Sequence, residues 1–116
     1  MAITKTAAIF RKSGETLDIT AAADIPAGAI KVIDGCNCIA LWPIANGEAG
    51  SLKILHKGEV VEITTDAAIG TTVAGTALYV VAATGLVTKT AEGNTLLGYA
   101  RAAIGANDLS FEIVCA

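Results

Sequence analysis

The sequence has no apolar run near the ~20 residues that a transmembrane helix requires. Residues 1–14, MAITKTAAIFRKSG, also lack the apolar centre of a secretory signal peptide. Basic residues are few and scattered, and the net charge is −3. Nucleic-acid binding would require clustered Lys and Arg. We therefore expect neither a membrane nor a nucleic acid as a partner.

Amphipathic helical periodicity is missing as well. Aromatic residues make up 4% and charged residues 16% of the chain, against 53% hydrophobic residues. Apolar and polar residues instead alternate over short segments that end at Gly, Pro or Asn. Roughly nine or ten such segments, spaced by ~8–12 residues, are typical of a β-barrel or sandwich. The pattern predicts an all-β, single-domain fold with at most one or two helical turns, at residues 21–24 and 66–69.

One stretch organises the rest of the chain. Residues 77–101, ALYVVAATGLVTKTAEGNTLLGYAR, read as a meander of three short strands with two turns. Leu78 and Val80 are expected to share the inward face of the first strand. Gly98 interrupts the third strand, which predicts a bulge or a close backbone approach. We find no internal repeat or linker, so residues 14–116 are predicted to form one domain.

Asp34-Gly35 is a strong hairpin signal between strands predicted at residues 29–33 and 36–42. The second of these strands would place on one face Cys36, Cys38, Ala40 and Trp42. Trp42 precedes a proline and would either anchor a small core or pack at a subunit contact.

The remaining strands alternate more simply. A strand at residues 15–20 would direct Leu17 and Ile19 inward. Further strands are predicted at residues 51–57, 60–64 and 109–115. In the first of these, Leu52, Ile54 and His56 would share a face, with His56 half-buried or hydrogen-bonded at an interface. Val61 and Ile63 are expected to point inward in the second. The apolar face of the third would consist of Leu109, Phe111, Ile113 and Cys115.

The N-terminal residues 1–13 alternate weakly and end at a break before Gly14. They hold three of the eight basic residues of the chain. We interpret them as an arm that a partner orders, by pairing with a sheet edge. The alternative is that they form the first strand of the domain's own sheet.

Three cysteines and one histidine are the candidates for chemistry. An odd number of cysteines without a secretory signal indicates reduced thiols. Cys36, Cys38, Cys115 and His56 would be the four ligands of a Cys₃His zinc site, but structural zinc more often uses cysteines separated by two residues, on a turn. Buried, metal-free cysteines are the favoured interpretation.

No catalytic motif accompanies these residues. Catalysis by a cysteine nucleophile would use a Cys–His pair. None of the cysteines lies on a segment typical of a nucleophile turn. Residues 70–75, GTTVAG, lack the Lys-Ser/Thr pair of a phosphate-binding loop. We therefore predict a protein that is not an enzyme, without catalytic, cofactor-binding or metal-binding residues.

The pattern of turns and strands over residues 13–115 resembles the small bacteriophage capsid decoration, or cement, proteins. This resemblance depends mainly on residues 75–79, GTALY, on 84–88, TGLVT, and on 93–100, GNTLLGYA. The cysteines and the Trp42-Pro43 pair depart from the usual pattern, so contacts are not transferred residue by residue.

The resemblance implies a structural protein of the virion with a compact β fold. It would be made in the bacterial host cytoplasm and would bind the major capsid protein on the outer surface of the head, commonly as a homotrimer. An alternative from a different class is a small β-barrel module that holds a ligand or metal through Cys36, Cys38 and His56.

Overall fold

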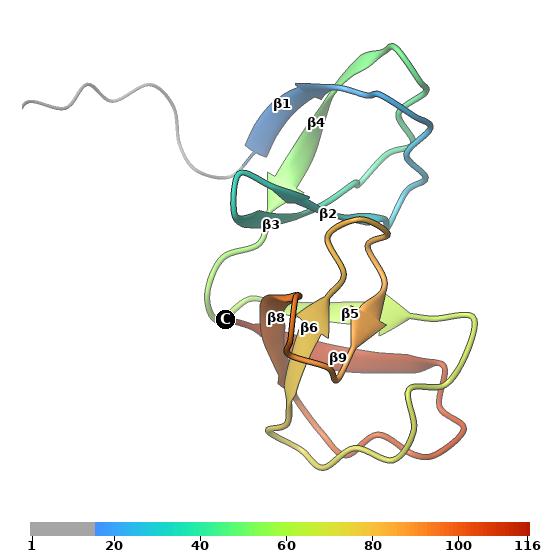
Figure 1. Cartoon of the computed structure of the whole chain (residues 1–116), viewed down its shortest axis with the longest axis vertical. Coiled ribbons are helices and arrows are strands. Elements are labelled where there is room, and N and C mark those ends of the chain that lie inside the picture. The colour runs from blue at the N-terminus through green and yellow to red at the C-terminus, as the bar shows by residue number, and fades with distance from the viewer. Residues whose placement is uncertain (1–15) are drawn as a thin grey trace, which may run out of the picture.

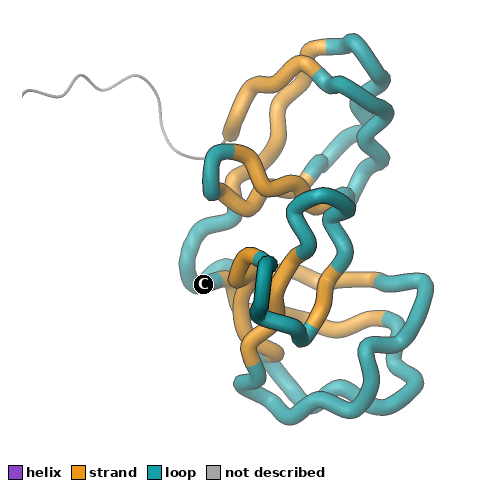
Figure 2. The backbone as a smooth tube through the Cα atoms, in the orientation of Figure 1, coloured by secondary structure: helices purple, strands orange, loops and turns teal. Residues whose placement is uncertain are grey.

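Antiparallel β-strands provide all the regular secondary structure of residues 16–116, which a computed structural model describes. The nine strands form two sheets, with the orders β1-β4-β3-β2 and β5-β9-β8-β6-β7 (Figure 1). Figure 2 shows only strands and loops in this range. The predicted all-β class is confirmed, as two packed sheets and not as a closed barrel.

The first sheet is one long hairpin folded back on itself. β1 (Thr16–Thr20) pairs with β4 (Ala49–Ile54), and β2 (Ile30–Ile33) pairs with β3 (Cys36–Ile39). An isolated bridge between Ile25 and Ile44 continues the same register between these two ladders. The predicted turn at Asp34-Gly35 closes the hairpin with φ values of 51° and 79°, as a two-residue hairpin turn requires.

The second sheet is built in the same way. β5 (Val60–Thr64) pairs with β9 (Ser110–Cys115), and β6 (Ala77–Val80) pairs with β8 (Thr95–Ala100). A bridge between Thr72 and Ile104 joins the two ladders. The short β7 (Val87–Thr88) adds to the free side of β6.

These two halves are therefore a tandem repeat of one four-stranded unit. Strands β1, β2, β3 and β4 correspond in order and pairing to β5, β6, β8 and β9. The loops agree as well, because Gly28 donates to the Ala40 carbonyl oxygen at 2.6 Å and Gly75 to that of Ala100 at 2.8 Å. The expectation of no internal repeat was wrong.

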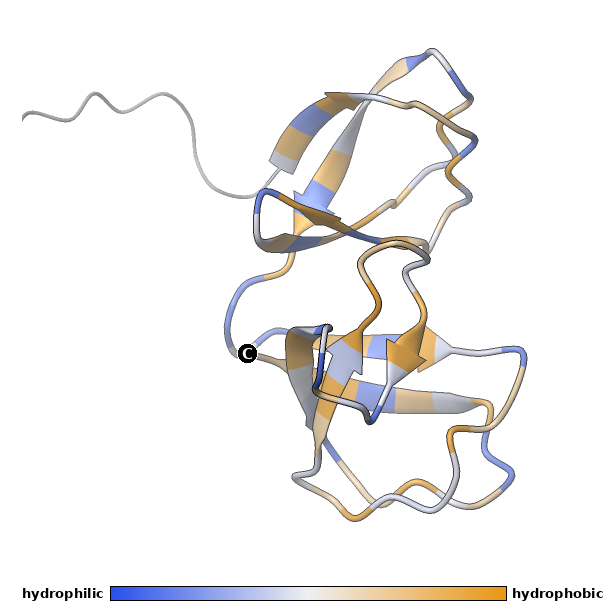
Figure 3. Ribbon diagram, viewed as in Figure 1, coloured by the Kyte–Doolittle hydropathy of each residue, from blue (hydrophilic) through white to orange (hydrophobic). Residues whose placement is uncertain are grey.

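Each half encloses its own apolar cluster. Alternation of apolar and polar residues along β1 and β9 separates inward from outward side chains (Figure 3). The first cluster consists of Ala21, Ile25, Cys38, Ala40, Ile44 and Leu52. The second consists of Ile30, Leu55, Ile63, Leu78, Val80, Leu97, Ala100, Ile104, Phe111, Ile113 and Cys115.

The outward face of β2 and β3 packs on the second half. Ile30 is a member of the second cluster although it belongs to the first sheet, and Val32 and Ile39 pack against that cluster. Asn37 Nδ2 donates to the Leu96 carbonyl oxygen at 2.8 Å across the same junction. The loop after β6 also reaches β2 (Figure 1), where a Cβ at Gly85 would collide with the Ile30 carbonyl oxygen.

The two predicted helical turns were wrong. Ala21 donates to the Glu48 carbonyl oxygen at 2.9 Å and accepts from the Gly47 amide at 2.7 Å, so cross-strand pairing replaces a helical bond. In the second segment, Thr65 Oγ1 donates to the Ala67 carbonyl oxygen at 2.7 Å within a bend. Gly47 and Glu48, the backbone partners of Ala21, lie far from it in the sequence, so the local pattern at residues 21–24 does not reveal them.

Interpreting residues 77–101 as a simple meander was also wrong. β6 lies between β7 and β8, so the third strand returns to the opposite side of the first. The expected irregularity at Gly98 is confirmed by a register shift after Leu78 in the β6–β8 ladder. A Cβ at Gly98 would collide with the Val114 carbonyl oxygen and lie 3.0 Å from its carbonyl carbon.

Candidate interaction surface

The residues of the alternative zinc site are dispersed over different environments. Cys38 belongs to the first apolar cluster and Cys115 to the second, whereas Cys36 and His56 are exposed. Residues 16–116 contain no group of three or more His, Cys, Asp or Glu side chains placed to hold a metal ion. Burial was therefore predicted correctly for Cys38 and Cys115 and wrongly for Cys36.

Burial also determines the chemistry of the two inner thiols. It raises the pKa of Cys38, to which the neighbouring Cys36 adds a smaller contribution. Burial likewise raises the pKa of Cys115, and the negative charge of Glu59 adds to the effect. Both thiols are thereby kept in the protonated form, which packs as a small apolar group and is a poor nucleophile.

The predicted faces fail at the strand ends. β3 ends at Ile39, because the Ala40 amide donates to Ala29 O at 3.0 Å and its carbonyl accepts from Gly28 in a corner. Trp42 therefore leaves the expected inward row and is 74% exposed, so the core alternative for this residue was wrong. His56 follows the end of β4 and Leu109 precedes the start of β9, and both are exposed.

The linker between the sheets, residues 55–59, is braced by Glu59. Lys53 Nζ contacts Glu59 Oε2 at 2.9 Å and Oε1 at 3.1 Å. The His56 amide donates to Glu59 Oε1 at 2.6 Å. The hydrogen bond from Lys53, followed by that from the His56 amide, holds the pKa of the Glu59 carboxyl below its usual range.

Replacing Glu59 with glutamine is expected to reduce stability at pH 7 but not at acidic pH. A carboxyl with a lowered pKa in the folded state stabilises the fold above its unfolded pKa of about 4.3, and this contribution is lost as the pH falls through the folded pKa. Urea unfolding at pH 7 and at pH 3 should show that difference for Glu59→Gln. Glu92→Gln, in an exposed turn, is the matched control. An equal loss at both pH values would contradict this role of the charge.

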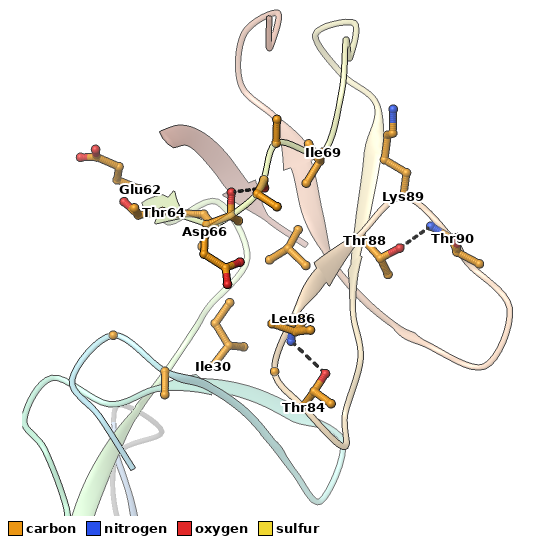
Figure 4. Close-up of a pocket in the computed structure, with 18 of the residues that line it drawn as sticks. Ile30, Glu62, Thr64, Asp66, Ile69, Thr84, Leu86, Thr88, Lys89 and Thr90 are labelled. Atoms are coloured by element: carbon orange, nitrogen blue, oxygen red, sulfur yellow. Dashed lines mark hydrogen bonds between the residues drawn. The ribbon is translucent and has the colours of Figure 1, made fainter. Parts of the chain in front are cut away.

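A cleft of about 870 Å³ lies between the two halves. One wall comprises residues 27–30, the second residues 62–69, and the third residues 84–90. Figure 4 shows Asp66 and Lys89 on opposite walls, with Ile30 between the halves. The threonine hydroxyls are used locally: Thr84 Oγ1 accepts from the Leu86 amide at 3.3 Å, and Thr88 Oγ1 from the Thr90 amide at 3.2 Å.

The cleft does not supply the residues of a cysteine-based active site. Its lining contains no histidine and no cysteine, so it offers no nucleophile–base pair of the Cys–His kind. It is bordered instead by β5 and β7, the two edge strands of the second sheet. Within residues 16–116 no helix is long and apolar enough to span a membrane.

The open edge of β5 carries unpaired backbone groups. The Cys115 amide donates to the Glu59 carbonyl at 2.8 Å, and the Thr65 amide to that of Leu109 at 2.8 Å. Because hydrogen-bonded pairs alternate along an antiparallel ladder, Val60, Glu62 and Thr64 direct their amides away from β9. An edge of this kind can pair with another chain.

Among residues 16–116, seven large apolar side chains are exposed, and five of them lie in loops: Leu41, Trp42, Val73, Leu86 and Leu109. Leu41 (52% exposed) and Trp42 form the tip of a corner loop in the first half. Val60 (46%) and Tyr99 (43%) instead lie on the outward face of the second sheet. Both flank Val114 in one cross-strand row, since Val114 pairs with each of them.

A charged row borders that apolar row. Arg101 Nη1 contacts Glu112 Oε2 at 2.7 Å, and Ser110 Oγ donates to Glu62 Oε1 at 2.6 Å. An apolar centre with a charged margin is the usual anatomy of a protein–protein interface. Sequence reasoning missed this surface, although Val60 and Tyr99 occupy outward positions where alternation predicts polar residues.

Comparison with protein families agrees with these features. A family model described as phage cement protein matches residues 11–115, nearly the whole chain. The searches of curated proteins and of solved structures return no match. The expected arm, residues 1–13, lies outside the described residues and mostly outside the matched range. The chain belongs to the phage cement protein family.

Proposed function

We propose that this protein binds the outer surface of an assembled phage head as a trimer and stabilises the shell. The family match over residues 11–115 is the observation that carries the proposal. Cementing a shell requires only additional contacts across the seams between capsid subunits. Such a protein needs a folded domain with a surface that binds other proteins, and it needs no catalytic group.

Two structural features support a binding role. The open β5 edge offers main-chain hydrogen bonds to an extended segment of another protein. The exposed Leu41 and Trp42 offer apolar area, and Trp is among the residues most often found at interface hot spots. These features lie on different halves of the chain, which suits a protein that has more than one partner.

Co-sedimentation with expanded, empty phage heads tests the proposal. The protein should pellet with heads and remain in the supernatant without them. At saturation, the number of copies bound at each threefold position of the capsid should be three or a multiple of three. Failure to pellet at any protein concentration, with correctly expanded heads, would contradict the function.

The N-terminal residues 1–13 are proposed to contact the capsid. They contain Lys5, Arg11 and Lys12 and no acidic residue, whereas the described part of the chain carries more acidic than basic residues. A basic, β-favouring segment is suited to pairing with a sheet edge on an anionic partner. Three such segments on one trimer would raise the effective concentration for the second and third contacts.

Deleting residues 1–12 is expected to leave the unfolding midpoint unchanged and to weaken head binding by about tenfold or more. Urea unfolding and co-sedimentation measure the two effects. Replacing Lys5, Arg11 and Lys12 with glutamine is the length-matched control, which removes charge but keeps the main chain. If the deletion unfolds the domain, residues 1–12 are an ordinary strand and the capsid role is wrong.

A further inference from the structure

We propose that the outward face of the second sheet around Val60, Tyr99 and Val114 is the contact between copies of this chain, and that a second copy covers it. This inference rests on the proposed trimer and identifies its surface. The tandem repeat supports it, because in the first half the β2–β3 part of the same face is covered by the second half.

The repeat assigns each position of this face an equivalent. Val60 and Tyr99 both flank Val114, as Thr16 and Ile39 both flank Lys53 in the first sheet. The neighbouring pairs are also equivalent: Ala77–Tyr99 in the second sheet and Ile30–Ile39 in the first.

In the first half, the part of this face on β2 and β3 is covered by the rest of the chain, whereas Thr16 on β1 is exposed. Ile30 is buried in the apolar cluster of the second half, and Ile39 packs against it. Residues 16–116 contain only these two repeats, so no third one covers the corresponding face of the second half. Tyr99, the equivalent of Ile39, is accordingly 43% exposed.

The uncovered face is the more apolar of the two. Thr16 and Lys53 of the first sheet are replaced at the equivalent positions by Val60 and Val114. In the first sheet, Lys53 is engaged by Glu59, whereas Val114 offers only apolar area. Exposed apolar residues grouped on a sheet face, inside a charged margin, indicate a protein partner.

The way the two repeats pack suggests a second copy as the partner of this face. Within the chain, the face of one repeat is covered by a different surface of the next repeat, so the contact is head-to-tail. The same mode between chains gives a heterologous contact, and a heterologous contact with a threefold rotation closes into a trimeric ring. The open edge of β5, which begins at Val60, adds main-chain donors and acceptors beside the apolar row.

Single substitutions with a matched control test the inference in solution. Tyr99→Lys should weaken self-association about 30-fold or more, as expected for a central apolar contact. Val73→Lys changes an exposed apolar residue of a loop outside this face, at which no contact is proposed, and should leave the mass unchanged. Light scattering over a range of concentrations measures the mass, and urea unfolding shows that each variant is folded. A trimer that persists in Tyr99→Lys would overturn the inference.

Photo-crosslinking on heads covers the case in which copies meet only after binding. p-Benzoylphenylalanine replaces Tyr99 in one variant and the exposed Val73 in the other. Position 99 should give products of two and three chain masses, and position 73 should not. Crosslinks from position 99 to the capsid protein alone, or no crosslink between copies while the protein is bound to heads, would overturn the inference. Trimers that form but never pellet with heads would instead contradict the proposed function and leave this contact standing.

Discussion

Gly98→Ala is expected to lower the free energy of unfolding by about 3 kcal/mol, because the new methyl group has no space. A Cβ at this position collides with the Val114 carbonyl oxygen and lies 3.1 Å from the Cys115 Cα. Both are backbone atoms of β9 and cannot rotate away as a side chain can. Either β8 must separate from β9 or the bulge after Leu78 must shift, and both changes disturb the second cluster. Urea unfolding measures the loss.

Gly93→Ala is the matched control. Gly93 has a φ of +75° in an open turn, with no atom near an added Cβ. Alanine there carries only the left-handed backbone cost of about 1 kcal/mol. Equal losses for the two variants would show that backbone conformation, and not the close approach to β9, explains the effect at Gly98.

Leu52→Ala is expected to cost about 3 kcal/mol and to destabilise both halves together. Leu52 is fully buried in the first cluster. The halves are joined by Ile30 in the second cluster and by the Asn37–Leu96 hydrogen bond, so we expect residues 16–116 to unfold in one transition. Hydrogen exchange of the Leu78 and Ile113 amides should therefore accelerate although both lie in the other half.

Leu41→Ala provides the control for an exposed leucine of the same half, and it should change the exchange rates little. Unchanged protection of the Leu78 and Ile113 amides in Leu52→Ala would show that the two halves unfold independently. The expectation of one domain over residues 14–116 would then be wrong.

Local signals in the sequence predicted local structure well. The turn at Asp34-Gly35 formed because Gly takes the positive φ of a hairpin turn without strain, and Asp tolerates it. The irregularity at Gly98 was predicted because a strand-interior glycine marks a close approach. Alternation also identified the inward faces of β5 and β9, where Ile63, Phe111 and Ile113 are buried.

Long-range pairing explains what the sequence did not reveal. The tandem repeat depends on registers such as Ile25 with Ile44 and Thr72 with Ile104, which pair residues far apart in the sequence. The similar loops IPAG and PIANG in the first half, and TVAG and IGAND in the second, were the available signal. Alternation also gives no strand order, so it did not place β6 between β7 and β8.

The candidate surface was only partly accessible from sequence. The family resemblance predicted a capsid decoration protein, and the family match supports a role in decorating a phage capsid. The outward row of Val60, Tyr99 and Val114 comes from three strands, and only their register brings it together. The sequence did not decide whether Trp42 is a core residue or part of a subunit contact, because the end of β3 depends on the corner at Ala40.

Survival of phage heads under heating is the measurement that tests the cementing function most directly. Expanded heads would be heated with and without saturating protein, and intact shells counted by electron microscopy. We predict that decorated heads remain intact at temperatures that disrupt bare heads, and that Tyr99→Lys, which weakens the trimer, protects less than Val73→Lys. Decorated heads that break at the same temperature as bare heads, despite full occupancy, would contradict the cementing function.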